Sequence, residues 1–401
     1  MGKSTSKVLR WLVGFILLAA LVGLGVSQMP TWGTSSETGD RASTQPGARS
    51  ITLTDLAGRE VTLRQPVERI VLVRGRDVYE LALLLGEDLP RKLIAWGPDL
   101  EQYDSDAYRV YVERFPSLAN LPEIGSVYAD AVDAENLLVL QPDLVIVDTF
   151  MAQRGYKCLG RMERAGLPLL HLDFSRKPFE GPQRSIRLLG QALGRQRRAK
   201  EVADFVQARL DEVTSGLSEP PASPASIYME CGYKGVKEYG HCFGYIDRGQ
   251  LRAWSLIMDR LGCRNIAAGL GPPMAAIHPE QLLTANPDVI VITGAHWPAT
   301  PDSTHLGYRA DPADAEQRLR AFTTRPGWAD LKAVKTNRVY GVFHGFCMHT
   351  MNFAALQQLA KWLYPERFAD LDPVARLREF HDRFLPVDYS GVWMNSLEQE
   401  Q

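Results

Sequence analysis

A short segment near the C-terminus carries the most concentrated metal-binding chemistry of the chain. Residues 344–349 read His-Gly-Phe-Cys-Met-His and follow a predicted strand, so two imidazoles, a thiol and a thioether lie close together. These donors suit a late or soft metal such as nickel, cobalt, copper or zinc. One loop seldom encloses a metal ion, and a metal chelate can need only one axial histidine. We therefore expect His344 and His349 to be metal ligands, direct or axial; the alternative is loop histidines bonded to the backbone.

Two arginines follow another predicted strand. Residues 69–73 (RIVLV) are apolar after the first position, and Arg74 and Arg76 then flank Gly75. In open α/β sheets, ligands bind outside the carboxyl ends of the strands. A guanidinium matches the oxygens of a carboxylate or catecholate. We expect at least one of the two arginines to contact an anionic ligand, with surface charge on a loop as the alternative.

The same strand-end rule selects further candidates in both halves of the chain. The full set of candidate ligand-binding residues is Arg74, Arg76, Tyr128, Asp148, Tyr233, Lys234, Tyr239, His241, His296, Trp297, His344 and His349. The three tyrosines and the tryptophan could stack on a planar chelate, or pack within a lobe. His241 and His296 are weaker metal candidates. Cys231 and Cys242 could form a disulfide in an oxidising compartment, or stay buried as free thiols.

The elements that must position these residues come in two similar copies. Residues 132–147 (VDAENLLVLQPDLVIV) correspond to residues 277–292 (IHPEQLLTANPDVIVI) at a constant offset. Each copy predicts a short helix with an inner face of leucines, a Pro-Asp turn, and a strand buried on both faces. The inner-face leucines are Leu137, Leu138, Leu282 and Leu283. Uniformly apolar strands suit a parallel sheet covered by helices, so two copies predict two similar α/β lobes.

A long helix is predicted between the two copies. Residues 199–216 carry apolar side chains at steps of three and four, and Gly194 predicts a break before them. Such a helix is long enough to bridge two lobes. We expect a signal peptide or membrane anchor at 1–27, a flexible tether at 28–49, an N-terminal α/β lobe at 50–180, a helical segment at 181–217, a linker at 218–226, a C-terminal α/β lobe at 227–365 and a C-terminal helical extension at 366–401.

Composition narrows the class of protein. The 401 residues are enough for two domains with substantial cores, and 45% hydrophobic with 23% charged residues is ordinary for a globular protein. The net charge of −2 argues against nucleic-acid binding. The five cysteines form no C-x-x-C pair, which argues against a structural zinc site or a redox dithiol. The absence of a G-x-S-x-G, H-E-x-x-H or P-loop motif argues against an enzyme.

The N-terminus predicts export. Three basic residues precede an apolar run, residues 11–26. This run is shorter than the roughly 20 residues of a membrane span, and Gly25 and Ser27 suit a signal-peptidase site. We expect a cleaved signal and a periplasmic protein, with an uncleaved anchor as the alternative.

Several segments, in order and correctly spaced over residues 51–364, resemble the periplasmic substrate-binding proteins of ABC importers for ferric siderophores, haem and vitamin B12. The segments are the hairpin DLAGREVTL at 55–63 before RIVLV, the E-x-L-L and Pro-Asp-strand unit in each half, Gly262 with Asn265-Ile266-Ala267, and Arg325-Pro326-Gly327-Trp328 before Ala333-Val334. The resemblance implies two Rossmann-like lobes bridged by one long α-helix, with the ligand in a cleft between the lobes and small closure on binding.

The resemblance also implies docking on the permease through one acidic residue per lobe, at the positions of Glu135 and Glu280. A carboxylate in the first turn of a helix is favoured by the helix dipole, and an exposed one can pair with arginine on a partner. The alternative is an ordinary acid at a helix start.

These observations predict a binding protein rather than an enzyme. It would capture a metal chelate (ferric siderophore, haem, corrinoid or similar) and deliver it to an ABC transporter permease, as a monomer with no resident cofactor and no nucleic-acid partner. One alternative is a binding protein for a free or weakly chelated transition metal such as nickel, which would need three or four histidine and carboxylate ligands converging. The other is a membrane-anchored two-lobed enzyme or sensor.

Overall fold

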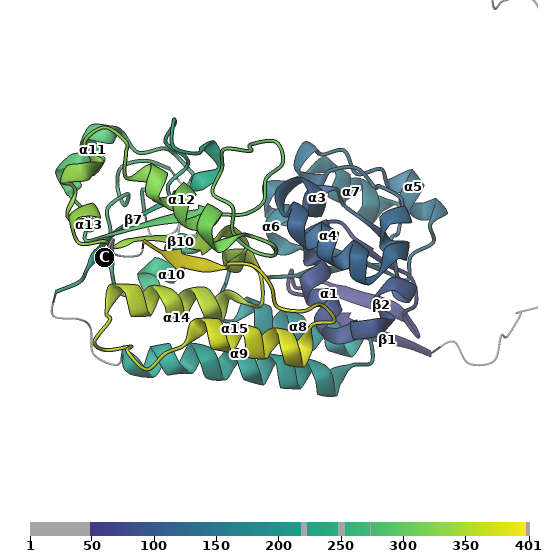
Figure 1. Ribbon diagram of the computed structural model, residues 1–401. Helices are drawn as coiled ribbons and strands as arrows, with labels where there is room; N and C mark the ends of the chain where they lie inside the picture. Colours follow the sequence, from purple (N-terminus) through teal and green to yellow (C-terminus); the bar gives the residue numbers. More distant parts are fainter. Residues whose placement is uncertain (1–48, 218–222, 248–252, 273, 398–401) are drawn as a thin grey trace, which may run out of the picture. The chain divides into compact units, whose positions relative to one another are not determined.

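Two sheets of mainly parallel strands and a layer of helices make up the fold (Figure 1). The computed structural model describes residues 49–217, 223–247, 253–272 and 274–397. The predicted fold class, two Rossmann-like lobes bridged by one long α-helix, is confirmed within these residues. No helix among them combines the length and apolar character needed to cross a membrane, and the apolar run at 11–26 lies outside them.

The first lobe is built on a four-stranded parallel sheet in the order β4-β3-β5-β6. Its strands are β3 (Ile70–Leu72), β4 (Leu93–Trp96), β5 (Leu144–Asp148) and β6 (Leu169–Leu172). The helices of this lobe are α1 (Val78–Leu85), α2 (Leu89–Lys92), α3 (Asp99–Tyr103), α4 (Ser105–Arg114), α5 (Ala134–Val139), α6 (Thr149–Arg154) and α7 (Lys157–Arg164). Successive residues of β5 enter two different core clusters, so the sheet is buried on both faces as predicted.

A hairpin precedes this sheet. Strands β1 (Arg49–Thr54) and β2 (Glu60–Gln65) pair antiparallel around Gly58, which has φ +83°. The predicted hairpin is therefore present, and Arg49 belongs to it rather than to a tether.

The second lobe has a five-stranded sheet in the order β11-β10-β9-β7-β8. Its strands are β7 (Ser226–Cys231), β8 (Arg264–Asn265), β9 (Val289–Gly294), β10 (Val339–Phe343) and β11 (Met394–Ser396). Its helices are α10 (Trp254–Arg260), α11 (Pro279–Ala285), α12 (Pro312–Phe322) and α13 (Lys332–Lys335). The last strand, β11, runs antiparallel along the edge of β10. The predicted C-terminal extension was purely helical, but it also contains β11. A strand of three residues gives too short a sequence pattern to detect.

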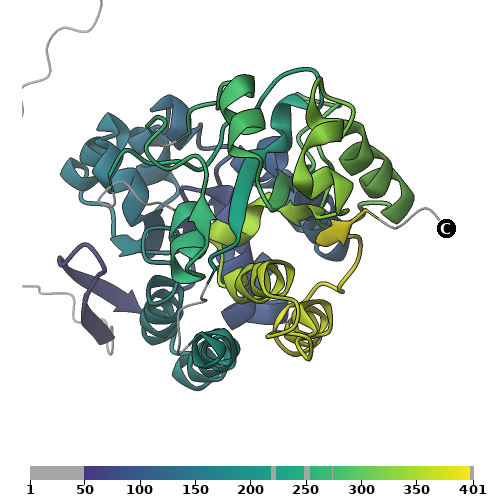
Figure 2. The same cartoon turned by 90° about the vertical axis from the view of Figure 1, so that its left-hand side faces the viewer.

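Four helices form a layer that contacts both lobes. They are α8 (Gly181–Ala192), α9 (Gln196–Gly216), α14 (Asn352–Leu363) and α15 (Pro373–Phe384). Figure 2 shows them nearly end-on, the teal pair beside the yellow pair. Phe205 of α9 packs against three phenylalanines of α14 and α15. Arg198 of the same helix donates to the carbonyl of Leu83 in α1 at 3.1 Å and to that of Phe384 at 3.1 Å. Helix α9 is therefore tied to both halves of the fold.

The repeated stretch forms the same unit twice. Helix α5 leads into β5, and α11 leads into β9. The aspartate of each Pro-Asp turn anchors the neighbouring strand: Asp143 Oδ2 accepts from the backbone of Arg69 at 3.0 Å, and Asp288 Oδ2 from that of Ser226 at 2.8 Å. One prediction was wrong, since Leu138 is 44% exposed. Adjacent residues of a helix point about 100° apart, so a helix this short buries Leu137 and turns Leu138 outward.

Candidate functional site

Arg74 stands at the carboxyl end of β3 and is only 2% exposed. Its Nε donates to Asp77 Oδ1 at 2.8 Å, and its Nη2 lies 3.3 Å from Asp148 Oδ2. Burial raises the pKa of Asp77 to about 7, against the lowering effect of Arg74 and with a further increase from Asp148. Asp77 therefore carries only part of a negative charge at neutral pH. Asp148 also caps α6, accepting from Phe150 N at 2.7 Å.

Arg76 follows on the same loop and is held by a carboxylate and two aromatic rings. Its Nε donates to Asp99 Oδ2 at 3.0 Å, and its Nη2 donates to Tyr128 Oη at 2.7 Å. Its guanidinium carbon lies 5.4 Å from the ring centre of Tyr103 and 5.7 Å from that of Tyr128. Gly75 lets this loop approach the loop after β4, because a Cβ there would meet the Gly97 carbonyl oxygen at 2.2 Å.

Both guanidinium groups have N–H donors that bind no other described residue. Among the described residues, neither Nη1 of Arg74 nor Nη1 of Arg76 donates a hydrogen bond to the protein. We call Arg74 and Arg76 the arginine pair. A group with oxygen acceptors at this point would receive hydrogen bonds from two fixed cations.

His344 stands opposite the arginine pair, at the carboxyl end of β10 in the second lobe. Its Nδ1 lies 2.8 Å from Thr293 Oγ1 and 3.6 Å from Cys231 Sγ. The ring of Trp297 lies 5.5 Å away, centre to centre. Burial, with a smaller contribution from the positive charge of Arg76, lowers the pKa of His344 to about 3. The imidazole is therefore neutral, and in the tautomer whose Nδ1–H donates to Thr293 the Nε2 lone pair is available to a metal.

His349 lies apart from His344, although both come from the same short segment. It is buried, and its Nδ1 lies 3.2 Å from Glu80 Oε1 in α1. Thr350 N donates to the same oxygen at 3.0 Å. Cys347 is also buried, and burial raises the pKa of its thiol. The His-Gly-Phe-Cys-Met-His segment is therefore divided, with His344 toward the arginine pair and His349 in a contact between the lobes.

His296 joins a different group. Its Nδ1 lies 2.7 Å from Asp106 Oδ1, and His305 Nε2 lies 2.6 Å from Asp106 Oδ2. We call these three residues the histidine–aspartate cluster. Asp106 belongs to the first turn of α4, whereas both histidines belong to the second lobe. One ligand atom from each of the three lies within 4.8 Å of the other two.

The remaining candidates of the second lobe lie in the loop after β7. Tyr233 Oη lies 3.3 Å from His241 Nε2, and burial lowers the pKa of that histidine. Lys234 is exposed and pairs with Glu238 at 3.1 Å. Tyr239 accepts a hydrogen bond from Trp328 Nε1 at 2.8 Å, and its ring lies 4.4 Å from the guanidinium carbon of Arg325. The structure thus places Tyr239 in the packing of this lobe.

The two cysteines of this loop are free thiols rather than a disulfide. Cys242 Sγ donates to the Ala275 carbonyl at 2.9 Å, while Cys231 Sγ faces His344. Burial raises the pKa of Cys231 to about 12 and that of Cys242 to about 11, so both are protonated.

Sequence reasoning missed several residues of these groups. Asp99 lies three positions beyond β4, so the strand-end rule could have found it. Asp106 and Glu80 lie within helices, and His305 lies in a polar loop. The hydrogen bonds that bring these three residues into the groups above cross between the lobes, and no local sequence pattern predicts such a contact.

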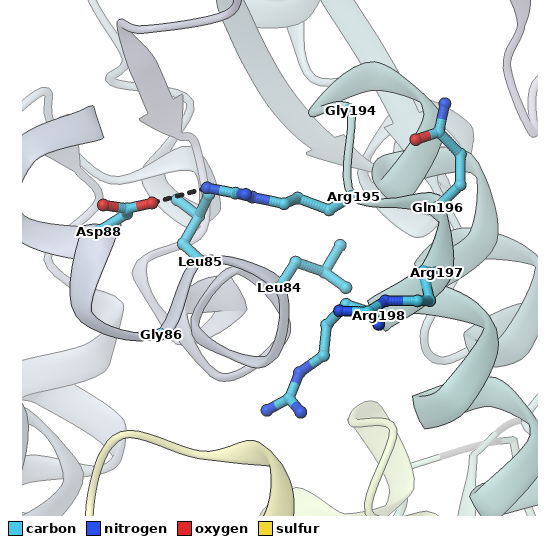
Figure 3. A pocket seen from close by; sticks show the side chains of 9 residues that line it. All are labelled: Leu84, Leu85, Gly86, Asp88, Gly194, Arg195, Gln196, Arg197 and Arg198. Atoms are coloured by element: carbon cyan, nitrogen blue, oxygen red, sulfur yellow. Dashed lines mark hydrogen bonds and ion pairs between the residues drawn. The ribbon is translucent and has the colours of Figure 1, made fainter.

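A groove in the structure lies elsewhere. It has a volume of about 580 Å³ and runs between the end of α1 and the start of α9, lined by arginines 195, 197 and 198 (Figure 3). Arg195 pairs with Asp88 there at 2.6 Å. None of the sequence-predicted site residues lines it.

The two proposed docking acids occupy equivalent places. Glu135 and Glu280 are exposed and lie in the first turns of α5 and α11. Each helix has a side-chain cap, Asp133 in one and His278 in the other. The duplicated helix–strand unit therefore presents one carboxylate from each lobe.

Comparison with known proteins identifies relatives that span both lobes. The family model described as "Periplasmic binding protein" matches residues 96–342. The crystal structure of FepB, a TroA-like periplasmic binding protein from Veillonella parvula, shares 33% sequence identity with this chain and a TM-score of 0.81. The match covers 87% of this chain and 100% of FepB.

Two further relatives are more distant in sequence. The molybdate-binding protein MolA of Haemophilus influenzae is 21% identical over 358 residues, which cover 84% of this chain and 91% of MolA. The uncharacterized ABC transporter substrate-binding lipoprotein YvrC of Bacillus subtilis is 20% identical over 324 residues, covering 80% of this chain and 87% of YvrC. The chain is thus similar to substrate-binding transport proteins over most of its length.

Proposed function

Because the chain belongs to the periplasmic binding protein family of ABC importers, we propose that it captures an anionic metal chelate between its lobes and delivers it to an ABC permease. Its relatives are substrate-binding transport proteins rather than enzymes. The family implies a place outside the cytoplasm, and the predicted signal segment supports the periplasm.

The arginine pair carries this proposal. Two buried guanidinium groups from one loop keep Nη1 donors unused among the described residues, and the positive charge of Arg76 acts on His344 in the opposite lobe. Buried arginines that retain donors favour an oxygen-rich anion, because the guanidinium is always charged and its donors have fixed directions. Catecholate, carboxylate and propionate groups of a chelate all supply such oxygens.

The surrounding carboxylates set the charge of the preferred ligand. Asp99 and Asp148 pair with the arginines, and Asp77 is partly protonated near neutral pH. Two guanidinium groups thus face three carboxyl groups, so their charge is already compensated before any ligand arrives. This balance avoids a large unpaired buried charge in the empty protein, and it favours ligands whose anionic charge is spread over several oxygens.

His344 supplies the second recognition element. Its neutral imidazole stands beside Trp297, so a planar or metal-bearing ligand on the arginine pair would meet an aromatic surface and an imidazole nitrogen. His349 is fully buried in the contact between the lobes, beside Glu80, whereas His344 is partly exposed. We therefore retain His344 alone as the axial candidate.

Titration of intrinsic tryptophan fluorescence with ferric 2,3-dihydroxybenzoate, hemin and molybdate tests the proposal. We expect saturable quenching by one of the two metal chelates. Arg76→Gln should weaken that binding by at least about tenfold, or about 1.4 kcal/mol. Arg91→Gln, at a side chain that is 68% exposed, is the matched control.

Two outcomes would contradict the proposal. Saturation by molybdate alone would mean that the ligand is a small oxyanion and not a metal chelate. The relative MolA is named as a molybdate-binding protein. Unchanged chelate affinity in a folded Arg76→Gln protein would remove the arginine pair from the site.

A further inference from the structure

We propose that the histidine–aspartate cluster (Asp106, His296 and His305) binds one divalent late transition-metal ion such as Zn²⁺, at a site that joins the two lobes and shares no residue with the arginine pair. The proposal does not depend on the identity of the transported ligand.

The donor set has the composition of a zinc site. Two imidazoles and one carboxylate are a common protein ligand set for Zn²⁺, with water in the fourth position. The three ligand atoms already lie within 4.8 Å of one another. His296 and His305 have ring centres 4.7 Å apart, so the two rings stand side by side over the same carboxylate.

Backbone contacts hold the donors in place. Ser105 N donates to the His296 carbonyl at 3.2 Å, which ties the start of α4 to the loop after β9. The Thr304 backbone pairs with Gly232 and Ala295, and this fixes the chain next to His305. Donors that are positioned before binding lower the cost of assembling a metal site.

Asp106 is a buried carboxylate. Its side chain is 3% exposed. Burial raises its pKa, but hydrogen bonds from His305 and His296 outweigh burial and leave the pKa below the usual value. A buried carboxylate between two histidines that remain partly exposed gives an ion both a fixed anionic ligand and an entry path from solvent.

Some charges around the cluster favour a bound cation and others oppose it. Asp314 Oδ2 lies 3.9 Å from His305 Nδ1, beyond hydrogen-bond distance, and adds negative charge on the far side of this imidazole. Arg318 holds Asp314 at 2.7 Å. Arg109 Nη1 lies 3.7 Å from Asp106 Oδ1 and opposes a cation, but this side chain is 52% exposed and can turn into solvent.

Because of the position of the cluster, a bound ion would stabilise the contact between the two lobes. Asp106 comes from the first lobe and both histidines from the second, so a bound ion is coordinated only while the lobes are in contact. An ion that binds this arrangement and not a separated one stabilises the contact by mass action.

Calorimetric titration of the metal-free full-length protein with Zn²⁺ tests the site, with Co²⁺ absorption spectra as a second readout of coordination geometry. We expect one ion per chain and a tetrahedral Co²⁺ spectrum. The double variant His296→Ala/His305→Ala should lose affinity by more than about a hundredfold, beyond the effect usual for an outer-shell partner. Asp106→Asn should lose affinity as well, and Arg109→Gln should gain it.

His278→Asn is the matched control, because His278 is an exposed helix cap and asparagine preserves the cap. Circular dichroism establishes that each variant is folded. Absence of one-to-one Zn²⁺ binding in the unaltered protein, or binding that survives the double variant, would overturn the proposal. Failure of chelate binding at the arginine pair would leave this result unaffected, so the two proposals are tested independently.

Discussion

His349 Nδ1 lies 3.2 Å from Glu80 Oε1, in a buried contact between helix α1 of the first lobe and the segment after β10 of the second. Thr350 N and Thr350 Oγ1 also donate to Glu80 Oε1, at 3.0 and 3.4 Å. A carboxylate with this many donors is satisfied without solvent. The contact therefore joins the lobes at one point, and it involves neither the arginine pair nor His344.

Loss of this carboxylate should destabilise the protein. We expect Glu80→Ala to lower the free energy of unfolding by about 3–5 kcal/mol, because it leaves His349 and the Thr350 amide buried without their acceptor. Glu80→Gln keeps one acceptor oxygen and should cost clearly less. Urea unfolding followed by circular dichroism measures both values, and equal losses in the two variants would show that the hydrogen bonds contribute little.

Binding of an anionic ligand should depend on pH through Asp77. Burial raises the pKa of this carboxyl to about 7, and an anion placed beside it would raise that pKa further. The complex then takes up a proton, so affinity should increase as the pH falls from 8 to 7 and level off below 7. The slope can reach about tenfold per pH unit.

Asp77→Asn should remove this dependence, since asparagine keeps the Oδ1 acceptor for Arg74 without titrating. The same residue makes a second, separate contribution to stability. Its folded pKa exceeds the usual 3.8, so the folded state binds more protons between about pH 4 and 7. The stability contribution of Asp77 should therefore fall as the pH rises through that window. A pH-independent affinity in the unaltered protein would place the anion away from Asp77.

The lobes could be predicted from the sequence because their strands are short, apolar and repeated. LVIV and VIVI are buried on both faces, and the Pro-Asp turns that precede them anchor the neighbouring strands. The strand-end rule then placed Arg74 and His344 correctly at the carboxyl ends of β3 and β10, since parallel strands all end at the same edge.

The strand-end rule did not predict the position of side chains whose hydrogen-bond partners lie in the other lobe. His349 follows β10 as His344 does, yet it pairs with Glu80 of α1. His296 precedes Trp297, but its partner Asp106 lies 190 positions away in sequence. Such partners depend on how the two lobes meet, and that contact leaves no periodic signal in either segment.

Docking on a permease should require Glu135 and Glu280. Both are exposed in the first turn of a helix, one from each copy of the repeat. We expect the double variant Glu135→Ala/Glu280→Ala to bind its ligand with unchanged affinity and to abolish uptake in cells that carry the cognate permease. Glu201→Ala, an exposed acid on α9, is the matched control and should transport normally. Impaired ligand binding in the double variant would show that these acids act on the ligand site instead.

Ligand capture should move the lobes only slightly. Helix α9 is 21 residues long and is tied to α1 through Arg198 and to α14 and α15 through Phe205, so bending it would break contacts in both halves. The Glu80–His349 contact opposes separation of the lobes as well. We expect the radius of gyration from small-angle scattering to change by less than about 1 Å when a saturating ligand is added, because the backbone of a preorganised binding surface itself moves by no more than about that distance. A larger compaction would mean that α9 bends or that the lobes separate in solution, and Glu80→Gln should then increase it.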